Sequence, residues 1–320
     1  MKQRRLGIDG PLVSSMGLGC MGMSGGTYGS ADRAESINTI HAALDAGVTL
    51  LDTGDFYSSG HNELLVAEAL KGRKREDAIL SVKFGMLISP DGSYSGIDCR
   101  PQAVTNSLSY TLARLNTDYV DIYRPARLDP TVPIEETIGA IADMVKAGYV
   151  RHIGLSEVDA EILRRAHAVH PITDLQFEYS LMSRDIEKEI LPTARELGIS
   201  ITAYGILSHG LLSGTWDKDR RTDGFDFRKH LPRFTGENLD KNLELVEALR
   251  TIAEEKNTTI ASLATSWVLS RGDDIIPLIG ARRLTQLQDA VTALDLQLTA
   301  SDLEKIQEAV PADAAAGTRY

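Results

Sequence analysis

The hydrophobic and polar positions of the chain repeat one arrangement: an amphipathic helix, a glycine, and then a short apolar run. In the first copy, Ile37, Ile40 and Leu44 recur at i, i+3 and i+7, which is the spacing of one helix face. Gly47 follows, and then the apolar run VTLLDTG. Glycine can end a helix in the left-handed conformation without a Cβ penalty. The pattern therefore predicts a helix that ends at a glycine and leads into a strand.

Two further copies of this arrangement occur later in the chain. Ile138, Ile141 and Val145 lead to Gly148 and the run YVRHIGLS, and the segment ARELG ends at Gly198 before ISITAYG. Helices that alternate with strands along a whole chain indicate parallel strands joined by right-handed crossovers. The repeat therefore predicts an α/β fold.

We count eight predicted strands, centred near residues 17, 51, 81, 122, 154, 177, 202 and 277. Eight strands in a chain of 320 residues favour a closed (β/α)8 TIM barrel over an open doubly wound sheet. A Rossmann domain would carry a GxGxxG fingerprint after an early strand, and the stretch GLGCMG is too short and wrongly spaced for it. We expect one barrel domain over residues 1–320.

Three segments fall outside the repeat. Residues 1–14 are predicted to form a β-hairpin that turns at Asp9 and Gly10 and plugs the barrel floor. Residues 215–235 have no clean period, and we expect this long stretch to be a lid, because long irregular loops in compact domains are usually functional. Residues 311–320 are expected to form a mobile tail.

Composition narrows the function classes. The chain has a net charge of -11, which disfavours nucleic acid and anionic membranes as partners, since phosphate binding needs a basic face. No run approaches the ~18 apolar residues of a membrane span, and we expect a cytoplasmic protein. The only cysteines, Cys20 and Cys99, have no histidine at metal spacing, which predicts neither a disulfide nor a metal site.

Polar residues at predicted strand ends suggest acid–base chemistry. Barrel enzymes carry their active sites where the strands end, and Asp52, Tyr57 and Lys83 stand at two such ends. A tyrosine alone is a poor acid near neutral pH; a neighbouring lysine lowers its pKa, and an aspartate holds the lysine in place. Singly, each residue has an ordinary structural explanation. The three together predict a catalytic group.

Several motifs, read with this group, carry a resemblance to a known family. They are LGLGCMGMS, LLDTGDFYSSGHNELLVAEAL, SVKFG, RLNTDYVDIY, GYVRHIGLSE, LQFEYSL, ITAYGILSHGLLSG and IPLIGARRLTQLQDA. Over roughly residues 5–310 the chain resembles the aldo-keto reductase superfamily, and RRAHAVHPITDLQFEYSL is most similar to the branch of perakine and pyridoxal reductases. The resemblance implies a barrel that binds NADP(H) without a Rossmann domain and transfers hydride between the nicotinamide and a small-molecule carbonyl or alcohol substrate.

The resemblance also assigns roles to single residues. Tyr57 matches the general acid, and Asp52 and Lys83 match the pair that tunes it. Ser156 and Gln176 match the side chains that bind the nicotinamide carboxamide. A further set matches the rest of the cofactor site: Tyr204 stacking on the nicotinamide ring, Leu207 and Leu211 along the pyrophosphate, and Gly280, Arg282 and Gln286 at the adenosine end.

Two residues, Arg282 and Ala290, bear on how the adenosine end of the cofactor would be bound. A guanidinium matches phosphate oxygens in a two-pronged way, and Arg282 therefore favours NADPH over NADH through the 2′-phosphate. A solvated surface pair of Arg282 and Arg283 is the alternative explanation. Ala290 stands where the family usually has an asparagine, which weakens the prediction for the adenine end.

The family's fourth catalytic residue is missing. It is a histidine in a segment like YYQHRVDP, which aligns with YRPARLDP and falls on Ala126. Arg124, paired with Glu157 or Glu178, and the loop residue His61 are the candidates to replace it in the substrate pocket. Potassium-channel β subunits, which resemble reductases, also lack this histidine. A nicotinamide-binding sensor or regulatory module with slow chemistry is therefore the alternative to an enzyme.

Overall fold

The eight predicted strands form one closed parallel barrel in the computed structural model, which describes residues 1–216 and 225–320. The barrel strands are β3 (Gly17–Gly19), β4 (Leu50–Gly54), β5 (Ile79–Phe84), β8 (Val120–Pro125), β9 (Val150–Ser156), β10 (Ile172–Glu178), β11 (Ser200–Tyr204) and β12 (Ile275–Ile279). Each strand pairs with its neighbours in chain order, and β12 closes the barrel on β3. The predicted (β/α)8 barrel is confirmed.

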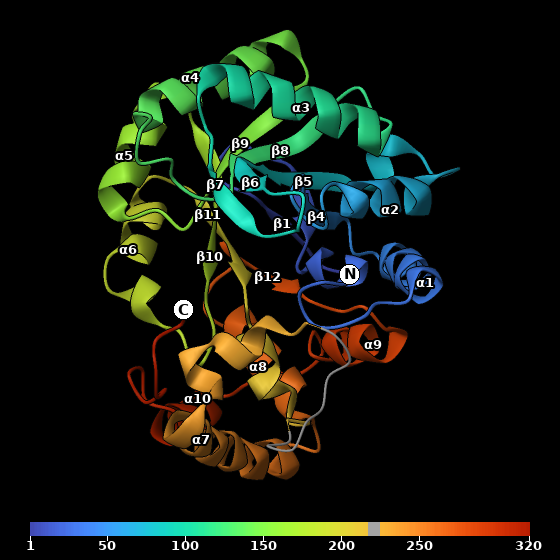
Figure 1. The fold of residues 1–320 in the computed structure, drawn as a ribbon. Coiled ribbons are helices and arrows are strands. Elements are labelled where there is room, and N and C mark those ends of the chain that lie inside the picture. Colours follow the sequence, from blue (N-terminus) through green and yellow to red (C-terminus); the bar gives the residue numbers. More distant parts are fainter. Residues whose placement is uncertain (217–224) are drawn as a thin grey trace.

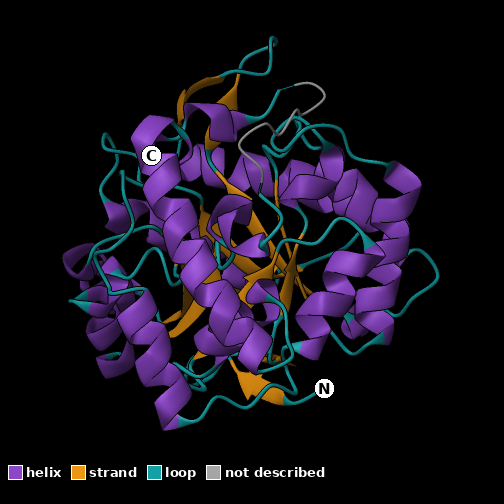
Figure 2. Cartoon of the chain, turned by 90° about the horizontal axis from the view of Figure 1, so that it is seen from below, coloured by secondary structure: helices purple, strands orange, loops and turns teal. Residues whose placement is uncertain are grey.

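Helices surround the barrel on its outside (Figures 1 and 2). They are α1 (Arg33–Asp45), α2 (His61–Leu70), α3 (Pro101–Leu115), α4 (Ile134–Ala147), α5 (Ala160–Val169), α6 (Ile190–Glu196), α7 (Gly236–Glu255), α8 (Ile260–Leu269), α9 (Leu284–Thr292) and α10 (Ala300–Ala309). Short 3-10 helices are η1 (Met21–Ser24), η2 (Arg75–Asp77), η3 (Asp185–Glu187), η4 (Ser208–Ser213), η5 (Phe227–His230) and η6 (Pro232–Phe234). None of the described helices is long and apolar enough to cross a membrane.

The predicted helix stops lie where the glycine pattern placed them. Gly47, Gly148 and Gly198 follow α1, α4 and α6 with φ of 88°, 87° and 69°, the left-handed conformation that glycine adopts without steric cost. Ile138 and Ile141, which defined the apolar face of the second copy, are fully buried on α4. Local sequence pattern is thus sufficient to place these helix ends.

The amino-terminal hairpin closes one end of the barrel, which we call the floor. Its strands are β1 (Gln3–Arg5) and β2 (Leu12–Ser14). Leu6 and Val13 pack against barrel residues in a cluster that also contains Leu50, Ile122, Ile276 and Leu278. Figure 2 shows the amino terminus at this end. The prediction that the hairpin plugs the floor is confirmed.

The predicted turn of this hairpin is wrong in detail. Arg5 pairs with Leu12, so the connection is the six-residue loop 6–11 rather than a two-residue turn at Asp9 and Gly10. The loop is closed by a 3.0 Å hydrogen bond from the Leu6 backbone N–H to the Pro11 carbonyl. Contact with the barrel explains the longer loop, because Leu6 reaches into the floor and the Gly7 N–H donates to the Ser200 hydroxyl at 2.7 Å.

The carboxyl ends of the barrel strands form the opposite end, which we call the rim. A second hairpin, β6 (Met86–Ile88) and β7 (Tyr94–Ile97), follows β5 there and was not predicted from the sequence. It lies in front of the barrel in Figure 1, whereas β1 lies behind. The loops that could carry chemistry are therefore gathered at one end of the molecule.

Candidate active site at the rim

Asp52, Tyr57 and Lys83 lie together at the rim. Asp52 is on β4 and Lys83 on the neighbouring β5, and their side chains form a buried ion pair between Nζ and Oδ1. Tyr57 lies in the loop after β4, and Lys83 Nζ is 5.3 Å from the centre of its ring. A Cβ at Gly54 would approach Phe56 to 3.2 Å and Lys83 to 3.4 Å, so glycine provides the space that this packing needs. The structure brings the predicted trio into one site.

The electrostatics of the trio differ from the expectation that Lys83 lowers the pKa of Tyr57. Burial raises the pKa of Tyr57 well above its ordinary value, with the Asp52 carboxylate adding to the effect and Arg127 opposing it. Burial also lowers the pKa of Lys83, whereas the Asp52 charge raises it. Tyr57 is consequently a neutral phenol at neutral pH, which is the form that can give up a proton to a substrate oxygen.

Asp52 is also the acceptor for two further residues of the barrel interior. The Ser81 hydroxyl donates to its Oδ2 at 2.9 Å, and Gln176 Nε2 donates to the same atom at 2.7 Å. Ser156 pairs in register with Gln176 across β9 and β10, and both side chains are buried. Ser156 and Gln176 thus lie beside the trio, and their role toward a nicotinamide stays a prediction.

Arg124 does not replace the missing histidine in the way that the sequence suggested. Its side chain is fully buried inside the barrel, where Nη1 lies 2.9 Å from Asp174 Oδ2 and Nη2 donates to Ser81 Oγ at 2.8 Å. The partner is therefore Asp174, and neither Glu157 nor Glu178 pairs with it. A Cβ at Gly154 would come within 2.6 Å of Asp174 Oδ1, so this glycine makes room for the pair.

Ala126 and His61 supply no donor to the site either. Ala126 directly follows β8, is 2 % exposed, and its N–H donates to the Phe84 carbonyl at 2.8 Å. His61 is exposed at the first residue of α2, and its Nε2 lies 3.4 Å from Arg33 Nη1 on α1. The proposed pocket role of His61 gains no support from these contacts.

The next residue, Arg127, was overlooked in the sequence although it stands in the same PARLDP segment. Its half-buried guanidinium folds back over the strand end and donates to the Ala126 carbonyl at 2.7 Å. Its charge lowers the pKa of both Tyr57 and Lys83. The position after a barrel strand was the available signal, since such positions line the active sites of barrel enzymes.

Tyr204 ends β11 and meets the carboxyl-terminal tail. Its hydroxyl donates to Glu157 Oε1 at 2.9 Å and lies 3.0 Å from the Tyr320 hydroxyl. Arg319 binds the same Glu157 carboxylate with both terminal nitrogens, at 2.8 and 3.2 Å. The end of the segment 311–320 therefore lies over the rim in this structure, and its expected mobility stays a prediction.

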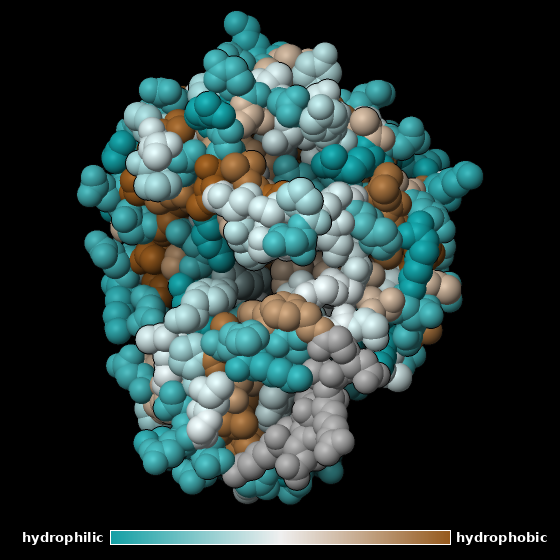
Figure 3. Space-filling model, viewed as in Figure 1, coloured by the Kyte–Doolittle hydropathy of each residue, from teal (hydrophilic) through white to brown (hydrophobic). Residues whose placement is uncertain are grey.

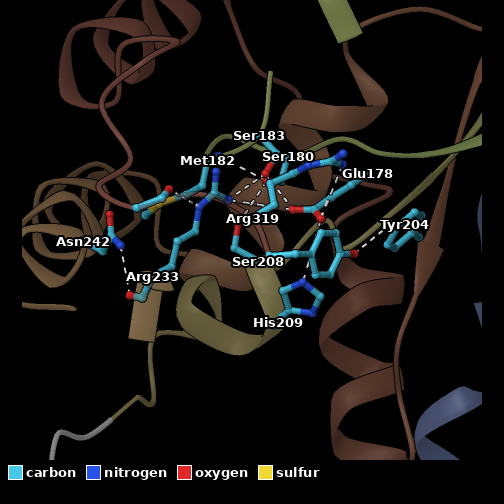
Figure 4. A network of polar contacts seen from close by, with 12 residues as sticks. Glu178, Ser180, Met182, Ser183, Tyr204, Ser208, His209, Arg233, Asn242 and Arg319 are labelled. Atoms are coloured by element: carbon cyan, nitrogen blue, oxygen red, sulfur yellow. Dashed lines mark hydrogen bonds and ion pairs between the residues drawn. The ribbon is translucent and has the colours of Figure 1, made fainter. Parts of the chain in front are cut away.

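A buried carboxylate joins the tail to two loops (Figure 4). Glu178, at the end of β10, accepts a 2.6 Å hydrogen bond from Ser183 Oγ. Arg233 Nη1, Arg319 Nη1 and His209 Nε2 lie 3.8, 3.7 and 3.8 Å from its oxygens. Burial lowers the pKa of His209. Two arginines and a histidine from three separate segments thus converge on one carboxylate.

The loop after β11 has an unusual backbone. Ser208, His209 and Gly210 in η4 have φ of 47°, 55° and 105°, which only glycine adopts without strain. Leu207 precedes them and is half-buried, and Leu211 is fully buried against a cluster that includes Leu231 and Phe234. Strained backbone of this kind gathers at ligand sites, and the loop is where the resemblance expects the pyrophosphate.

The predicted adenosine end lies at the start of α9. Arg282 Nη1 donates to the carbonyls of Tyr28 and Ser30, at 3.2 and 2.9 Å, and its backbone N–H donates to Gln286 Oε1 at 3.1 Å. A Cβ at Gly280 would meet no atom within 4 Å, so the backbone there borders open space. The structure brings Gly280, Arg282 and Gln286 together, and their binding of a 2′-phosphate stays a prediction.

Two loops join across the rim beside Arg282. Tyr28 pairs with Asp226 in an isolated antiparallel bridge, and the Gly29 N–H donates to the Phe225 carbonyl at 3.1 Å. The Tyr28 and Phe227 rings meet edge to face, with their centres 5.2 Å apart. Of the predicted lid, residues 217–224 lie outside the described residues.

Figure 3 shows that the face of the molecule seen in Figure 1 is hollowed near its centre.

The whole chain is similar to known proteins with this arrangement. The model of the aldo/keto reductase family matches residues 15–311. The chain belongs to the aldo-keto reductase family. Its members are NAD(P)H-dependent carbonyl oxidoreductases. A probable aldo-keto reductase 1 from Glycine max is 41 % identical over 318 residues, which cover 99 % of this chain and 91 % of the relative.

Solved structures of other aldo-keto reductases superpose closely on this one. A glycerol dehydrogenase from Gluconobacter oxydans has a TM-score of 0.87 and 29 % identity, covering 96 % of this chain and 94 % of its own. A holo-form aldo-keto reductase from Bacillus halodurans has a TM-score of 0.80 and 27 % identity, covering 98 % and 97 %. The barrel and its small-molecule carbonyl chemistry are thus common to this chain and its relatives, and substrate and cofactor preference are questions of the individual site.

Proposed function

We propose that this protein is an NADPH-dependent oxidoreductase that interconverts an aldehyde or ketone and the corresponding alcohol, with Tyr57 as the general acid and base. The observation that supports the proposal is the arrangement at the rim, where the buried Asp52–Lys83 ion pair lies against the Tyr57 ring. An ammonium group beside a phenol stabilises the phenolate that remains after proton transfer. The hydroxyl of Tyr57 then protonates the carbonyl oxygen during reduction and takes the proton back during oxidation.

The remaining residues of the trio position this tyrosine. Asp52 holds Lys83 by charge, and Ser81 and Gln176 hold Asp52 from the barrel interior. A site whose donors are fixed before the substrate arrives loses less free energy to reorganisation during the reaction. Because these contacts come from β4, β5 and β10, the barrel itself supplies that rigidity.

The rim residues fit an extended nicotinamide nucleotide. When bound, the cofactor supplies the hydride. The open space beside Gly280 admits a ligand next to the backbone, and the nearby Arg282 guanidinium, which donates to the carbonyls of Tyr28 and Ser30, has the geometry that suits a phosphate. The residues that would hold the cofactor are Ser156, Gln176, Tyr204, Leu207, Leu211, Gly280, Arg282 and Gln286.

Replacing Tyr57 by phenylalanine tests the assignment. The change removes the hydroxyl and keeps the ring, so we expect kcat to fall by at least about 10²-fold, the scale of general acid catalysis, whereas NADPH binding is unchanged. Tyr110, exposed on α3, provides the matched control, and Tyr110→Phe should leave kcat unchanged. A Tyr57→Phe variant with more than about a tenth of wild-type kcat would mean that another group is the acid.

The alternative of a nicotinamide-binding sensor rests on the missing histidine at Ala126. It predicts tight NADPH binding together with negligible turnover across a panel of aldehydes, ketones and secondary alcohols. The reductase predicts measurable loss of NADPH absorbance with at least one class of carbonyl compound. The same panel therefore discriminates between the two.

A further inference from the structure

Several charged side chains among the described residues of the rim form ion pairs with one another. Lys83 pairs with Asp52, Arg319 with Glu157, and Arg228 with Asp226. Arg233 lies 3.8 Å from the Glu178 carboxylate. Arg127 forms no ion pair with any carboxylate of the described residues, and Glu157, which acts on it from a greater distance, is already bound by Arg319.

This unpaired guanidinium lies between the catalytic trio and the tail. It donates to the Ala126 carbonyl at 2.7 Å, and the Tyr204 phenol is among the groups whose charge acts on it. Its charge also acts on titratable groups from several other elements, which are Tyr57, Lys83, Tyr94, Glu157, Tyr204 and Tyr320. A guanidinium has five N–H donors, more than two neutral acceptors use.

The free-energy cost of partly burying the Arg127 cation without a paired carboxylate argues for an anionic ligand. A partly buried cation is stabilised by a carboxylate or by water, and a folded protein usually provides the carboxylate. Here the polar neighbours of Arg127 are mainly a backbone carbonyl and phenol hydroxyls, which carry no negative charge while protonated. An anionic group on the substrate would supply the missing charge with the two-pronged geometry that guanidinium favours.

Aromatic rings lie beside the trio, and the charge of Arg127 acts on one of them, Tyr94. The Phe56 ring centre lies 4.8 Å from that of Tyr57 and 6.5 Å from that of Tyr94, which projects from the β6–β7 hairpin. Tyr94 is 66 % exposed. Such rings offer an apolar surface for a flat substrate body whose carbonyl reaches Tyr57.

We propose that Arg127 binds a carboxylate of the substrate, and that the protein therefore prefers aldehydes and ketones that carry a carboxylate, aromatic ones among them. The inference rests on the proposed reductase function and deepens it by naming a substrate class. Arg127 is then a specificity-determining residue, distinct from the trio that transfers the proton.

A pair of substrates that differ only in this charge tests the proposal. We expect wild-type kcat/KM to be higher for 4-formylbenzoate than for its neutral methyl ester. Arg127→Met should lower kcat/KM about 10- to 100-fold for the acid, the scale of a lost charged hydrogen bond, and less than about threefold for the ester. The loss should appear mainly in KM, and Arg127→Lys should recover part of it because it restores the charge.

Arg165→Met provides a matched control, since Arg165 is an exposed residue of α5 paired with Glu135. It should leave both substrates unchanged. An equal loss for acid and ester in Arg127→Met would overturn the proposal, as would a wild-type preference for the ester, because neither outcome involves the carboxylate.

A binding measurement separates this proposal from the reductase assignment. Benzoate should quench protein fluorescence or raise the melting temperature in the wild type and Arg127→Lys, and much less in Arg127→Met, with methyl benzoate as the neutral probe. Arg127-dependent benzoate binding without turnover of any carbonyl would contradict the reductase function and support the anion site. Turnover of neutral carbonyls together with Arg127-independent benzoate binding would support the reductase function and contradict the anion site at Arg127.

Discussion

The floor and the rim of the barrel are built on opposite principles. At the floor, Leu6 and Val13 of the hairpin pack onto Leu50, Ile122 and Ile276, and apolar burial needs no particular partner. At the rim, the same strands end in charged and hydroxylated side chains that form hydrogen bonds and ion pairs. The floor stabilises the fold with non-directional apolar contacts. The rim holds polar groups whose interactions depend on direction and charge.

Backbone strain is distributed in the same way. Among the described residues, the non-glycine residues with positive φ include Ser58, Ser59, Glu157, Ser208 and His209, all in loops that follow barrel strands at the rim. The two others, Asn116 and Asn257, follow helices. Strain of this kind persists where the surrounding structure over-determines it, often at ligand sites. The comparison teaches that stability and chemistry are assigned to opposite ends of one barrel, with the buried Arg124–Asp174 ion pair in the interior between them.

The largest expected effect concerns this buried ion pair. Replacing Arg124 with methionine leaves the Asp174 carboxylate buried without its cation, which should lower the free energy of unfolding by about 3 to 5 kcal/mol. Urea denaturation measures the change. The control is Arg165→Met, which removes an exposed pair and should cost no more than about 1 kcal/mol. Equal losses in the free energy of unfolding for the two variants would show that burial does not increase the contribution of the Arg124–Asp174 pair to stability.

A cavity at the floor should reduce stability without touching the chemistry. Leu6→Ala removes a fully buried side chain, and we expect a loss of about 2 to 5 kcal/mol in the free energy of unfolding. The kcat at a temperature below the unfolding transition should stay at the wild-type value. Ile8→Ala, at a 70 % exposed position of the same loop, is the matched control. A fall in kcat of the folded Leu6→Ala protein would show that the two ends are coupled.

The adenosine end of the rim should show a smaller and selective effect. Arg282→Ala removes the predicted partner of the 2′-phosphate, and NADPH binding should weaken by about 1.5 to 3 kcal/mol, the value of a hydrogen bond to a charged group. NADH binding should change little. Fluorescence quenching gives both dissociation constants. Equal losses for the two nucleotides would contradict the assignment to the phosphate, because only NADPH carries it.

A further expected effect at the rim is a pH dependence of the protein's stability. Burial, with the Glu63 charge adding, raises the pKa of Asp55 to about 7, above its usual value near ~3.9 in an unfolded chain. Between these values the folded state retains a proton that the unfolded state releases. Stability therefore falls as pH rises through that window, and the full loss is present above the folded pKa.

Asp55→Asn removes this titration. Melting temperatures measured from about pH 4 to about pH 8 should decline less in the variant, by a difference of a few degrees. Asp143→Asn, an exposed change on α4, is the control and should follow the wild type. A decline of the same size in Asp55→Asn would assign the pH dependence to another group.

Much of the fold could be predicted because its signals are local. The helix stops at Gly47, Gly148 and Gly198 depend on the conformation of single residues, and each strand follows from a short apolar run. Eight such strands between helices have few ways to close, so counting them was sufficient for the barrel. Asp52 and Lys83 could be assigned to one site because the carboxyl ends of parallel strands meet at one rim.

Only the tertiary structure decided which groups meet across the barrel. Arg124 and Asp174 are 50 residues apart and pair because β8 and β10 flank the same strand, with Gly154 leaving space between them. Within residues 1–216 and 225–320 no carboxylate pairs with Arg127, and Glu157 is bound instead by Arg319 from the far end of the chain. Sequence periodicity fixes which face of a strand a side chain occupies, and electrostatic partners depend on the position of every other charge in three dimensions.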